Sequence, residues 1–272
     1  MTNILVTNDD GIHAPGLLAL KQALMALGNV TVMAPERNWS AAGHSRTMHE
    51  PLRITRMNLA DGSEAYACTG GPADCVALAA LGALKTRFDL VVSGINSGHN
   101  MGNDITYSGT VACALEATIN GIPGIAVSTA LPPLAKCELG EARQVAGEVA
   151  YMVAAATLCN GLPPGTLLNV NVPAVPARQL RGVEVTRLGV RTYEDQLIER
   201  VDPYDRPYFW LGGALPIDMP DDGTDVGAVM NDIVSVTPIG LDMTDRGFLQ
   251  QLRDWQLELP PVGERHGLPS GE

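Results

Sequence analysis

The feature that most constrains the fold is the alternation of strand-like and helix-like segments along the first two thirds of the chain. Short apolar runs rich in β-branched residues recur between longer segments with apolar residues at helical spacing. Such alternation forms βαβ units, with parallel strands and helices on both faces of the sheet. The expected strands are Asn3–Thr7, Val30–Ala34, Leu90–Ser93, Gly124–Thr129 and Leu167–Val172, and the expected helices are Pro15–Leu27, Pro72–Leu84, Ser108–Ile119 and Glu138–Leu158.

Charge and composition narrow the functions open to this α/β fold. The 272 residues are 46% hydrophobic and 18% charged, which is enough apolar mass for a globular core. The formal net charge is −12, from 18 basic and 30 acidic residues, so the chain lacks the basic surface that a duplex nucleic-acid binder needs. A small anion can still bind where a metal ion or backbone amides supply local positive charge.

The sequence gives no sign of membrane insertion or export. No apolar run approaches the roughly 20 residues that span a bilayer, and no basic stretch precedes an apolar run at the N-terminus. The five cysteines are odd in number and form no C-x-x-C pair, which disfavours a disulfide framework or a zinc ribbon. We therefore expect a cytoplasmic enzyme with no membrane partner.

The pattern changes after Pro173, where β-like runs mix with charged turns. We expect a core over residues 1–181, a β-rich and helical C-terminal arm over residues 182–256, and a flexible tail over residues 257–272. Aromatic residues on an appendage too small for a core of its own favour a partner surface. In the arm, the expected strands are Val183–Leu188, Tyr208–Trp210 and Ile233–Thr237, the expected helix is Asp245–Trp255, and the aromatic residues are Phe209, Trp210, Phe248 and Trp255.

Two adjacent carboxylates, Asp9 and Asp10, follow the first expected strand. Open α/β sheets bind ligands beyond the carboxyl ends of their strands, so these residues belong to the expected binding edge. Adjacent carboxylates repel each other, and a divalent cation removes that penalty. The alternative is a plain turn, because Asn8–Gly11 (NDDG) is good turn chemistry by itself.

A long polar connection, Gly94–Thr110, follows the third expected strand of the core. Its seventeen residues are dominated by glycine, asparagine and serine, and loops of that length are usually functional or disordered. Asn96 offers an amide oxygen to a ligand. Ser108, Gly109 and Thr110 open a helix, whose free N–H groups and dipole suit a phosphate. The alternative for Ser108 alone is a helix cap without a ligand.

Common motifs of other enzyme classes are absent. The chain has no G-x-x-x-x-G-K-[ST] loop, no G-x-G-x-x-G after its first strand, no H-E-x-x-H and no G-x-S-x-G. These absences disfavour a P-loop nucleotidase, a dinucleotide-dependent enzyme, a zinc protease and an α/β-hydrolase.

The chain resembles the SurE family, the stationary-phase survival proteins that act as 5′/3′-nucleotidases. The matching strings are ILVTNDDG at Ile4–Gly11, TGGPADCV at Thr69–Val76, SGINSGHNMGNDITYSGTV at Ser93–Val111, TDVGA at Thr224–Ala228 and VSVTPI at Val234–Ile239. The resemblance extends from about Met1 to Leu252. It departs from the family pattern at Gly71, where threonine is commoner, and at Arg246, where some members carry histidine.

The resemblance implies a Rossmann-like core and a metal-dependent phosphomonoesterase that hydrolyses nucleoside monophosphates, with short polyphosphate as an open alternative substrate. It places one divalent ion per subunit, Mg²⁺ or Mn²⁺, on oxygen ligands, and it implies a homodimer or homotetramer formed through the arm. The implied metal ligands are Asp9, Asp10, Ser40 and Asn96, and the implied phosphate site is Ser108, Gly109 and Thr110, with Asn38, Ser45 and His44 lining the loop after the second strand.

The implied site raises two questions: how the phosphate ester is attacked, and whether the protein hydrolyses nucleotides or only binds them. Asp9, Asp10 and Asn96 are the expected catalytic group, acting with the metal on an attacking water. Phosphatases that use an aspartate nucleophile usually carry a D-x-D pair, whereas here the two aspartates are adjacent, which favours clasping an ion. The alternative from another class is a regulator that binds nucleotides in the same anion pocket without hydrolysing them.

Overall fold

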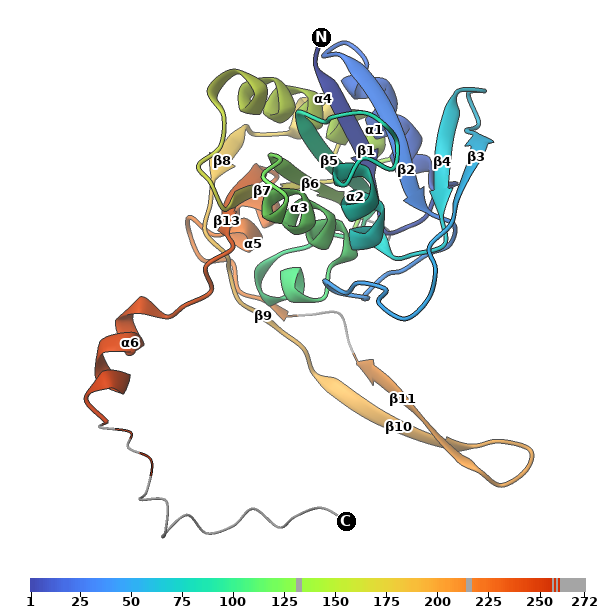
Figure 1. The fold of residues 1–272 in the computed structure, drawn as a ribbon. Helices are drawn as coiled ribbons and strands as arrows, with labels where there is room; N and C mark the ends of the chain where they lie inside the picture. The colour runs from blue at the N-terminus through green and yellow to red at the C-terminus, as the bar shows by residue number, and fades with distance from the viewer. Residues whose placement is uncertain (131–133, 214–216, 256, 258, 260–272) are drawn as a thin grey trace. The chain divides into compact units, whose positions relative to one another are not determined.

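The computed structural model describes residues 1–130, 134–213 and 217–255, together with Leu257 and Leu259. The chain forms two compact units, Met1–Leu241 and Asp242–Glu272. The first unit is built on a nine-stranded sheet in the order β3-β4-β2-β1-β5-β6-β7-β13-β8 (Figure 1). Its strands are β1 (Asn3–Thr7), β2 (Asn29–Pro35), β3 (Ile54–Asn58), β4 (Glu64–Cys68), β5 (Leu90–Ser97), β6 (Gly124–Thr129), β7 (Thr166–Val172), β8 (Val183–Val185) and β13 (Val234–Gly240).

The six central strands, from β4 to β7 in sheet order, all pair in parallel, and antiparallel pairs occur only at β3–β4 and β7–β13 among the described strands of this sheet. The helices of this unit are α1 (Pro15–Leu24), α2 (Pro72–Ala80), α3 (Gly109–Ile119), α4 (Leu139–Asn160) and α5 (Asp225–Met230), with short 3₁₀ turns η1 (Gly102–Thr106) and η2 (Ala177–Gln179). The expected Rossmann-like α/β core is confirmed.

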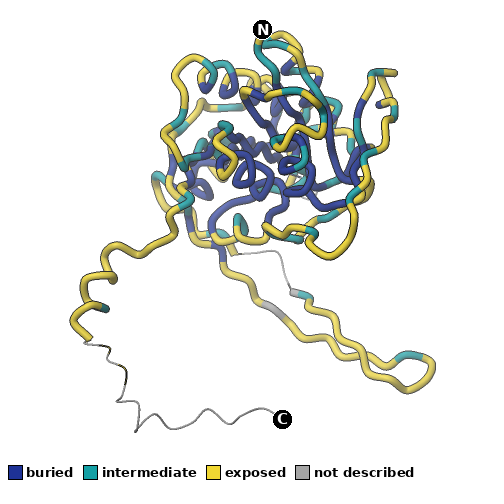
Figure 2. The backbone as a smooth tube through the Cα atoms, in the orientation of Figure 1, coloured by how far each residue is buried: buried dark blue, intermediate teal, exposed yellow. Residues whose placement is uncertain are grey.

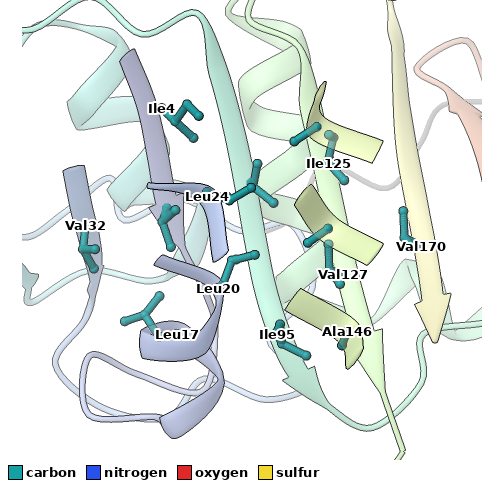
Figure 3. Close-up of a cluster of buried hydrophobic side chains, with 14 of the residues drawn as sticks. Ile4, Leu17, Leu20, Leu24, Val32, Ile95, Ile125, Val127, Ala146 and Val170 are labelled. Atoms are coloured by element: carbon teal, nitrogen blue, oxygen red, sulfur yellow. The ribbon is translucent and has the colours of Figure 1, made fainter. Parts of the chain in front are cut away.

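Successive apolar side chains along the buried strands point to opposite faces of the sheet, and helices cover both faces. In β1, Ile4 and Val6 pack with α1 and α4, whereas Leu5 between them packs with α2 and α3. Figure 3 shows the first of these clusters, in which Leu17 and Leu20 of α1 lie among strand residues. Both faces of the central strands are therefore apolar, as a parallel sheet requires.

The order of the strands creates the crevice that holds the site. From β1 the chain builds outward through β2 and β4, and it then returns to the other side of β1 to form β5. The carboxyl ends of β1 and β5 therefore diverge into loops on opposite sides, which is where open α/β sheets bind ligands. The loops after β1, β2 and β5 meet at this edge.

Several elements differ from the sequence expectation. Strand β5 continues to Ser97, and η1 occupies 102–106, so the connection expected as one irregular loop over Gly94–Thr110 is partly regular. Helix α1 ends at Leu24 and α2 at Ala80, whereas Leu27 and Leu84 were the expected ends. The residues after each helix form hydrogen-bonded turns that lead to the next strand. The outer pair β3–β4 and helix α5 are additional elements that sequence patterns did not indicate.

The segment after residue 181 contributes to the sheet and also leaves it. Strands β8 and β13 join the central sheet, so part of the expected arm completes the core. Strands β10 (Asp195–Val201) and β11 (Pro207–Gly213) form an antiparallel hairpin whose described residues are mostly exposed (Figure 2). The short strands β9 (Arg191–Thr192) and β12 (Ile217–Asp218) pair at its base.

The second unit contains helix α6 (Arg246–Arg253). Asp245 caps it by accepting hydrogen bonds from the N–H groups of Gly247 and Phe248 at 2.9 and 3.0 Å. The Phe248 and Trp255 rings pack edge to face, with centroids 5.7 Å apart. Across the described part of both units, no helix combines the length and apolar character needed to cross a bilayer.

Candidate active site

The turn after β1 presents Asp9 and Asp10. Asn8 closes this turn: its amide nitrogen donates to the Gly11 carbonyl at 3.0 Å, and its amide oxygen accepts from the Gly11 N–H at 3.2 Å. The turn chemistry expected of this segment is therefore present, and it is Asn8 that makes it. The two aspartates remain available for other contacts.

The surroundings of Asp9 and Asp10 disfavour the charged form of both carboxyl groups. Burial raises the pKa of Asp9 to about 6; the hydrogen bond from the Thr110 hydroxyl opposes that rise, and the charge of Asp10 adds to it. Burial also raises the pKa of Asp10, against the Ser97 N–H and the charge of Arg143. Among the described residues, no lysine or arginine forms an ion pair with either carboxylate. A bound cation would supply the missing charge.

Asn96 reaches the same edge because β5 is irregular at its end. The pairing of β5 with β6 shifts register between Ser93 and Asn96, and such bulges re-aim side chains beside active sites. Gly94 makes this possible: its φ is +134°, and a Cβ there would lie 2.3 Å from the Val127 carbonyl oxygen. The Asn96 amide nitrogen donates to the Gly98 carbonyl at 2.7 Å, which leaves the Asn96 amide oxygen free for a ligand.

The first turn of α3 packs directly against Asp9. The Thr110 hydroxyl donates to Asp9 Oδ1 at 2.5 Å, and a Cβ on Gly109 would lie 2.6 Å from Asp9 Cβ. Ser108 caps the helix by accepting from the Val111 N–H at 3.1 Å. The plain capping role of Ser108 is thus real, and it coexists with a helix N-terminus aimed at the carboxylates, which is an anion-binding arrangement.

A cavity of about 630 Å³ joins these features. Its lining includes Asp9, Ser40, Asn96 and Ser108, and its remaining lining residues are Ala41, Ser97, His99, Asn100, Asp104, Tyr107, Tyr193 and Leu211. A second cavity of about 660 Å³ lies between α1 and α4 and contains none of the expected site residues. Four of the expected site residues therefore meet in the cavity at the carboxyl ends of the strands, whereas Asp10, Asn38, Gly109 and Thr110 are not among its described lining residues.

Comparisons with known proteins identify the family of this chain. The family model described as "Survival protein SurE" matches residues 4–195, which is more than half of the chain. The chain belongs to the SurE family.

Individual relatives match over nearly their whole lengths. A Herpetosiphon aurantiacus protein named "5′-nucleotidase SurE" is 55% identical over 92% of this chain and 96% of its own. A Geobacter sulfurreducens protein of the same name is 46% identical over 97% of this chain and 98% of its own. The crystal structure of the SurE protein from Aquifex aeolicus superposes with a TM-score of 0.79 at 38% identity, covering 94% of this chain and all of that one.

In this SurE-family chain, the loop after β2 brings Asn38 and Ser40 to the carboxylates. Asn38 donates through its amide nitrogen to Asp10 Oδ1 at 3.4 Å and accepts from the Ser40 N–H at 2.7 Å. The Trp39 N–H donates to the Asp9 carbonyl at 2.8 Å. Ser45 is exposed, its hydroxyl donates to the Ala42 carbonyl at 3.4 Å, and it is not among the described residues that line the cavity.

Glu116 holds this loop, and sequence reasoning did not single it out. It lies on α3 two turns after Ser108, with its side chain 2% exposed, and it bonds His44 Nε2 at 2.9 Å. Arg46 Nη1 is 3.6 Å from its other carboxylate oxygen. His44 thus contacts α3, and the loop that carries Ser40 is fastened to the helix that carries Thr110. No periodicity in the sequence reports this contact, because its partners are 72 residues apart.

Sequence reasoning also missed a second polar cluster, which contributes Asp104 and Tyr193 to the lining of the cavity. Arg191 pairs with Asp104 at 2.6 Å and with Asp218 at 2.7 Å, and its side chain is 7% exposed. The Tyr193 hydroxyl donates to the same Asp104 at 2.6 Å. This cluster fixes η1 against the base of the β10–β11 hairpin.

The donor set fits a hard divalent cation. It consists of two carboxylates without a basic partner, the amide oxygen of Asn96 and the hydroxyl of Ser40, and all-oxygen ligands of this kind suit Mg²⁺ or Mn²⁺. Among the described residues, no group of three or more histidine, cysteine, aspartate and glutamate side chains could hold a metal, so nitrogen- and sulfur-rich centres are not indicated there. Arg246 pairs with Asp242 at 2.6 Å on the surface of the second unit.

Proposed function

We propose that this protein is a metal-dependent phosphomonoesterase that hydrolyses nucleoside monophosphates to nucleoside and phosphate. The observation that carries the proposal is the Asp9–Thr110 hydrogen bond, which joins a carboxylate of the proposed metal site to the start of α3. Asp9 and Ser108, the cap of that helix, line the same cavity. Membership of the SurE family, whose relatives are named 5′-nucleotidases, supports the same activity.

Asp9, Asp10, Ser40 and Asn96 would hold one Mg²⁺ or Mn²⁺ ion per subunit. When bound, the ion supplies Lewis acidity toward a phosphate oxygen and lowers the pKa of water. The N–H groups at the start of α3, with Ser108, Gly109 and Thr110, bind the oxygens of the phosphate and stabilise the negative charge that develops on them. Asn38 orients Asp10 from the other side. Ser45 is exposed and outside the cavity lining, so it would have to move toward the phosphate to contact it.

Water attacks phosphorus directly in this site. Asp9 is committed to Thr110 and packs against Gly109, so its carboxylate is positioned to bind rather than to act as a nucleophile. The bond from phosphorus to the nucleoside oxygen breaks as the bond to water oxygen forms, and the nucleoside leaves as its alcohol. One displacement inverts phosphorus, which hydrolysis of a chiral thiophosphate ester in ¹⁸O-water reports; a trapped phosphoaspartate would contradict it.

The test of the function is phosphate release from nucleoside monophosphates. Turnover should vanish in EDTA and return with Mg²⁺ or Mn²⁺. Asp9→Asn and Asp10→Asn should each lower metal affinity and activity together, because each removes one of the two charges that bind the ion. Asp222→Asn is the matched control, since Asp222 is an exposed carboxylate outside the cavity.

The same experiment separates the enzyme from a nucleotide-binding regulator. Tight nucleotide binding without phosphate release, in the presence of metal, would favour the regulator. Parallel assays with 3′- and 5′-nucleotides and with short polyphosphate define the substrate range. We further propose that the protein acts in the cytoplasm as a homodimer or homotetramer, assembled through the arm over residues 182–256, with residues 257–272 as a flexible tail.

A further inference from the structure

The catalytic cavity has an aromatic side that phosphate chemistry does not use. Tyr107, Tyr193 and Leu211 line it together with Asp9 and Ser108. Tyr107, Tyr193 and Leu211 are 67%, 45% and 87% exposed, so the two tyrosine rings are available to a ligand. A phosphate held at the start of α3 occupies only part of a cavity of about 630 Å³, a size typical of sites for whole small molecules.

Tyr193 is held in place. Its hydroxyl donates to Asp104 at 2.6 Å, and Asp104 is fixed in turn by Arg191 at 2.6 Å. Arg191 also pairs with Asp218 and packs on Gly102, where a Cβ would lie 3.3 Å from Arg191 Cγ. The ring therefore loses little conformational freedom when a ligand stacks on it, which favours binding.

The Tyr193 phenol stays neutral at physiological pH. Burial and the hydrogen bond to Asp104 raise its pKa to about 12. A neutral, electron-rich ring near an anionic site adds no repulsion toward a phosphate ester. Its face is suited to a flat heteroaromatic ring, because base–aromatic stacking works for every nucleobase.

We propose that Tyr193, with Tyr107, binds the nucleobase of the substrate by stacking while the start of α3 binds its phosphate. This inference rests on the proposed nucleotidase function and extends it to the part of the substrate that is not cleaved. It makes the base of the β10–β11 hairpin a specificity element of the active site.

The test compares AMP with ribose 5-phosphate, which has the same phosphoester and sugar but no base. The ratio of their kcat/KM values should fall about 5- to 150-fold in Tyr193→Ala, the range expected for loss of one base–aromatic stack. Tyr193→Phe keeps the ring and should keep most of the ratio. Tyr151→Ala is the matched control, because Tyr151 lies on α4 with a 40% exposed side chain outside this cavity.

The possible results separate the inference from the function. If Tyr193→Ala lowers kcat/KM equally for AMP and for ribose 5-phosphate, Tyr193 only supports the cavity and the inference is overturned. A change of oligomeric mass with an unchanged ratio would assign the ring to an interface between copies and would also overturn it. If the wild-type protein hydrolyses neither substrate, the proposed function fails, and the same ratio taken from dissociation constants for AMP and ribose 5-phosphate still tests the base site.

Discussion

Glu116 is a buried side chain that holds a loop of the proposed metal site without touching the expected ligands. Its carboxyl group is almost fully enclosed and is paired with His44 and Arg46 of the loop that carries Ser40. Charge-assisted hydrogen bonds of buried groups are worth about 1.5–3 kcal/mol. That free energy is available to hold the loop against α3.

Replacing this carboxylate should loosen the loop without removing a ligand. Glu116→Gln should lower the apparent metal affinity by about tenfold, because part of the ordering free energy of the loop must then come from metal binding. Activity as a function of Mg²⁺ or Mn²⁺ concentration measures this, and saturating metal should restore most of the turnover. Glu148→Gln on α4 is the control, and an unchanged metal dependence in Glu116→Gln would contradict the role assigned to this residue.

His99 is a half-buried residue of the cavity lining, and it makes stability depend on pH. Burial lowers its pKa from 6.5 to about 4; its hydrogen bond with the Val172 carbonyl and the charge of Asp218 oppose this, and Arg191 adds to it. The folded protein therefore resists protonation of this ring, whereas the unfolded chain accepts a proton below pH 6.5. The contribution to stability is fully present above pH 6.5 and is lost as the pH falls toward 4.

The size of this effect can be measured by urea unfolding at pH 7 and pH 5. The free energy of unfolding that the wild-type protein loses between these values should exceed the loss in His99→Gln by about 2 kcal/mol. Equal losses in the two proteins would show that His99 is protonated as easily in the folded state as in the unfolded chain.

The start of helix α3 packs directly against Asp9, the second residue after strand β1. The helix begins so close to Asp9 that only glycine fits at position 109, where an added Cβ would lie 2.8 Å from Asp9 Oδ2. The same helix carries the proposed phosphate site at its start and the Glu116 contact two turns later. The position of α3 would therefore couple the proposed metal and phosphate sites to the loop after β2.

Gly109→Ala should separate activity from stability. Alanine favours a helix over glycine by about 1 kcal/mol, so the helix itself gains stability. Asp9 must move to make room, and a displacement of about 1 Å at a reacting centre costs on the order of 100-fold in rate. Phosphate release and thermal unfolding measured together test this.

Gly140→Ala provides the control for that substitution. It also lies in the first turn of a helix, α4, and no heavy atom lies within 4 Å of its added Cβ. Near-normal turnover in Gly109→Ala would mean that the contact between α3 and Asp9 is not needed for the reaction.

For the molecule as a whole, exposed apolar surface points to assembly. The β10–β11 hairpin exposes Phe209, Trp210 and Leu211, and α6 exposes Phe248. Monomeric proteins rarely leave so much aromatic surface in contact with water, and aromatic residues are enriched at interfaces between chains. Both segments belong to the arm that we propose for oligomerisation.

Removal of residues 242–272 tests that proposal, because β13 ends at Gly240 and the central sheet stays complete. The truncated protein should have a lower oligomeric mass by light scattering, and its circular dichroism spectrum should lose only the contribution of α6. A shorter deletion, of residues 260–272, should leave the mass of the assembly intact. An unchanged oligomer without residues 242–272 would show that the second unit takes no part in assembly.

Local sequence determined the buried strands and the residues at their ends. β1 and β6 match their expected bounds, Asn3–Thr7 and Gly124–Thr129, because a parallel strand covered on both faces must be a continuous apolar run. Asp9, Asn96 and Ser108 were expected together, because parallel strands end at the same edge of a sheet. That expectation needed only the order of segments along the chain.

Tertiary structure decided what no local pattern encodes. The pair β3–β4 lies at one edge of the sheet, where polar residues such as Arg56 and Glu64 replace the apolar run. The contact of Glu116 with His44 spans 72 residues, and that of Arg191 with Asp104 spans 87. Such pairs form only after the strand order has brought distant loops to one edge, because the free energy that holds them comes from geometry in the folded state and not from the propensities of neighbouring residues.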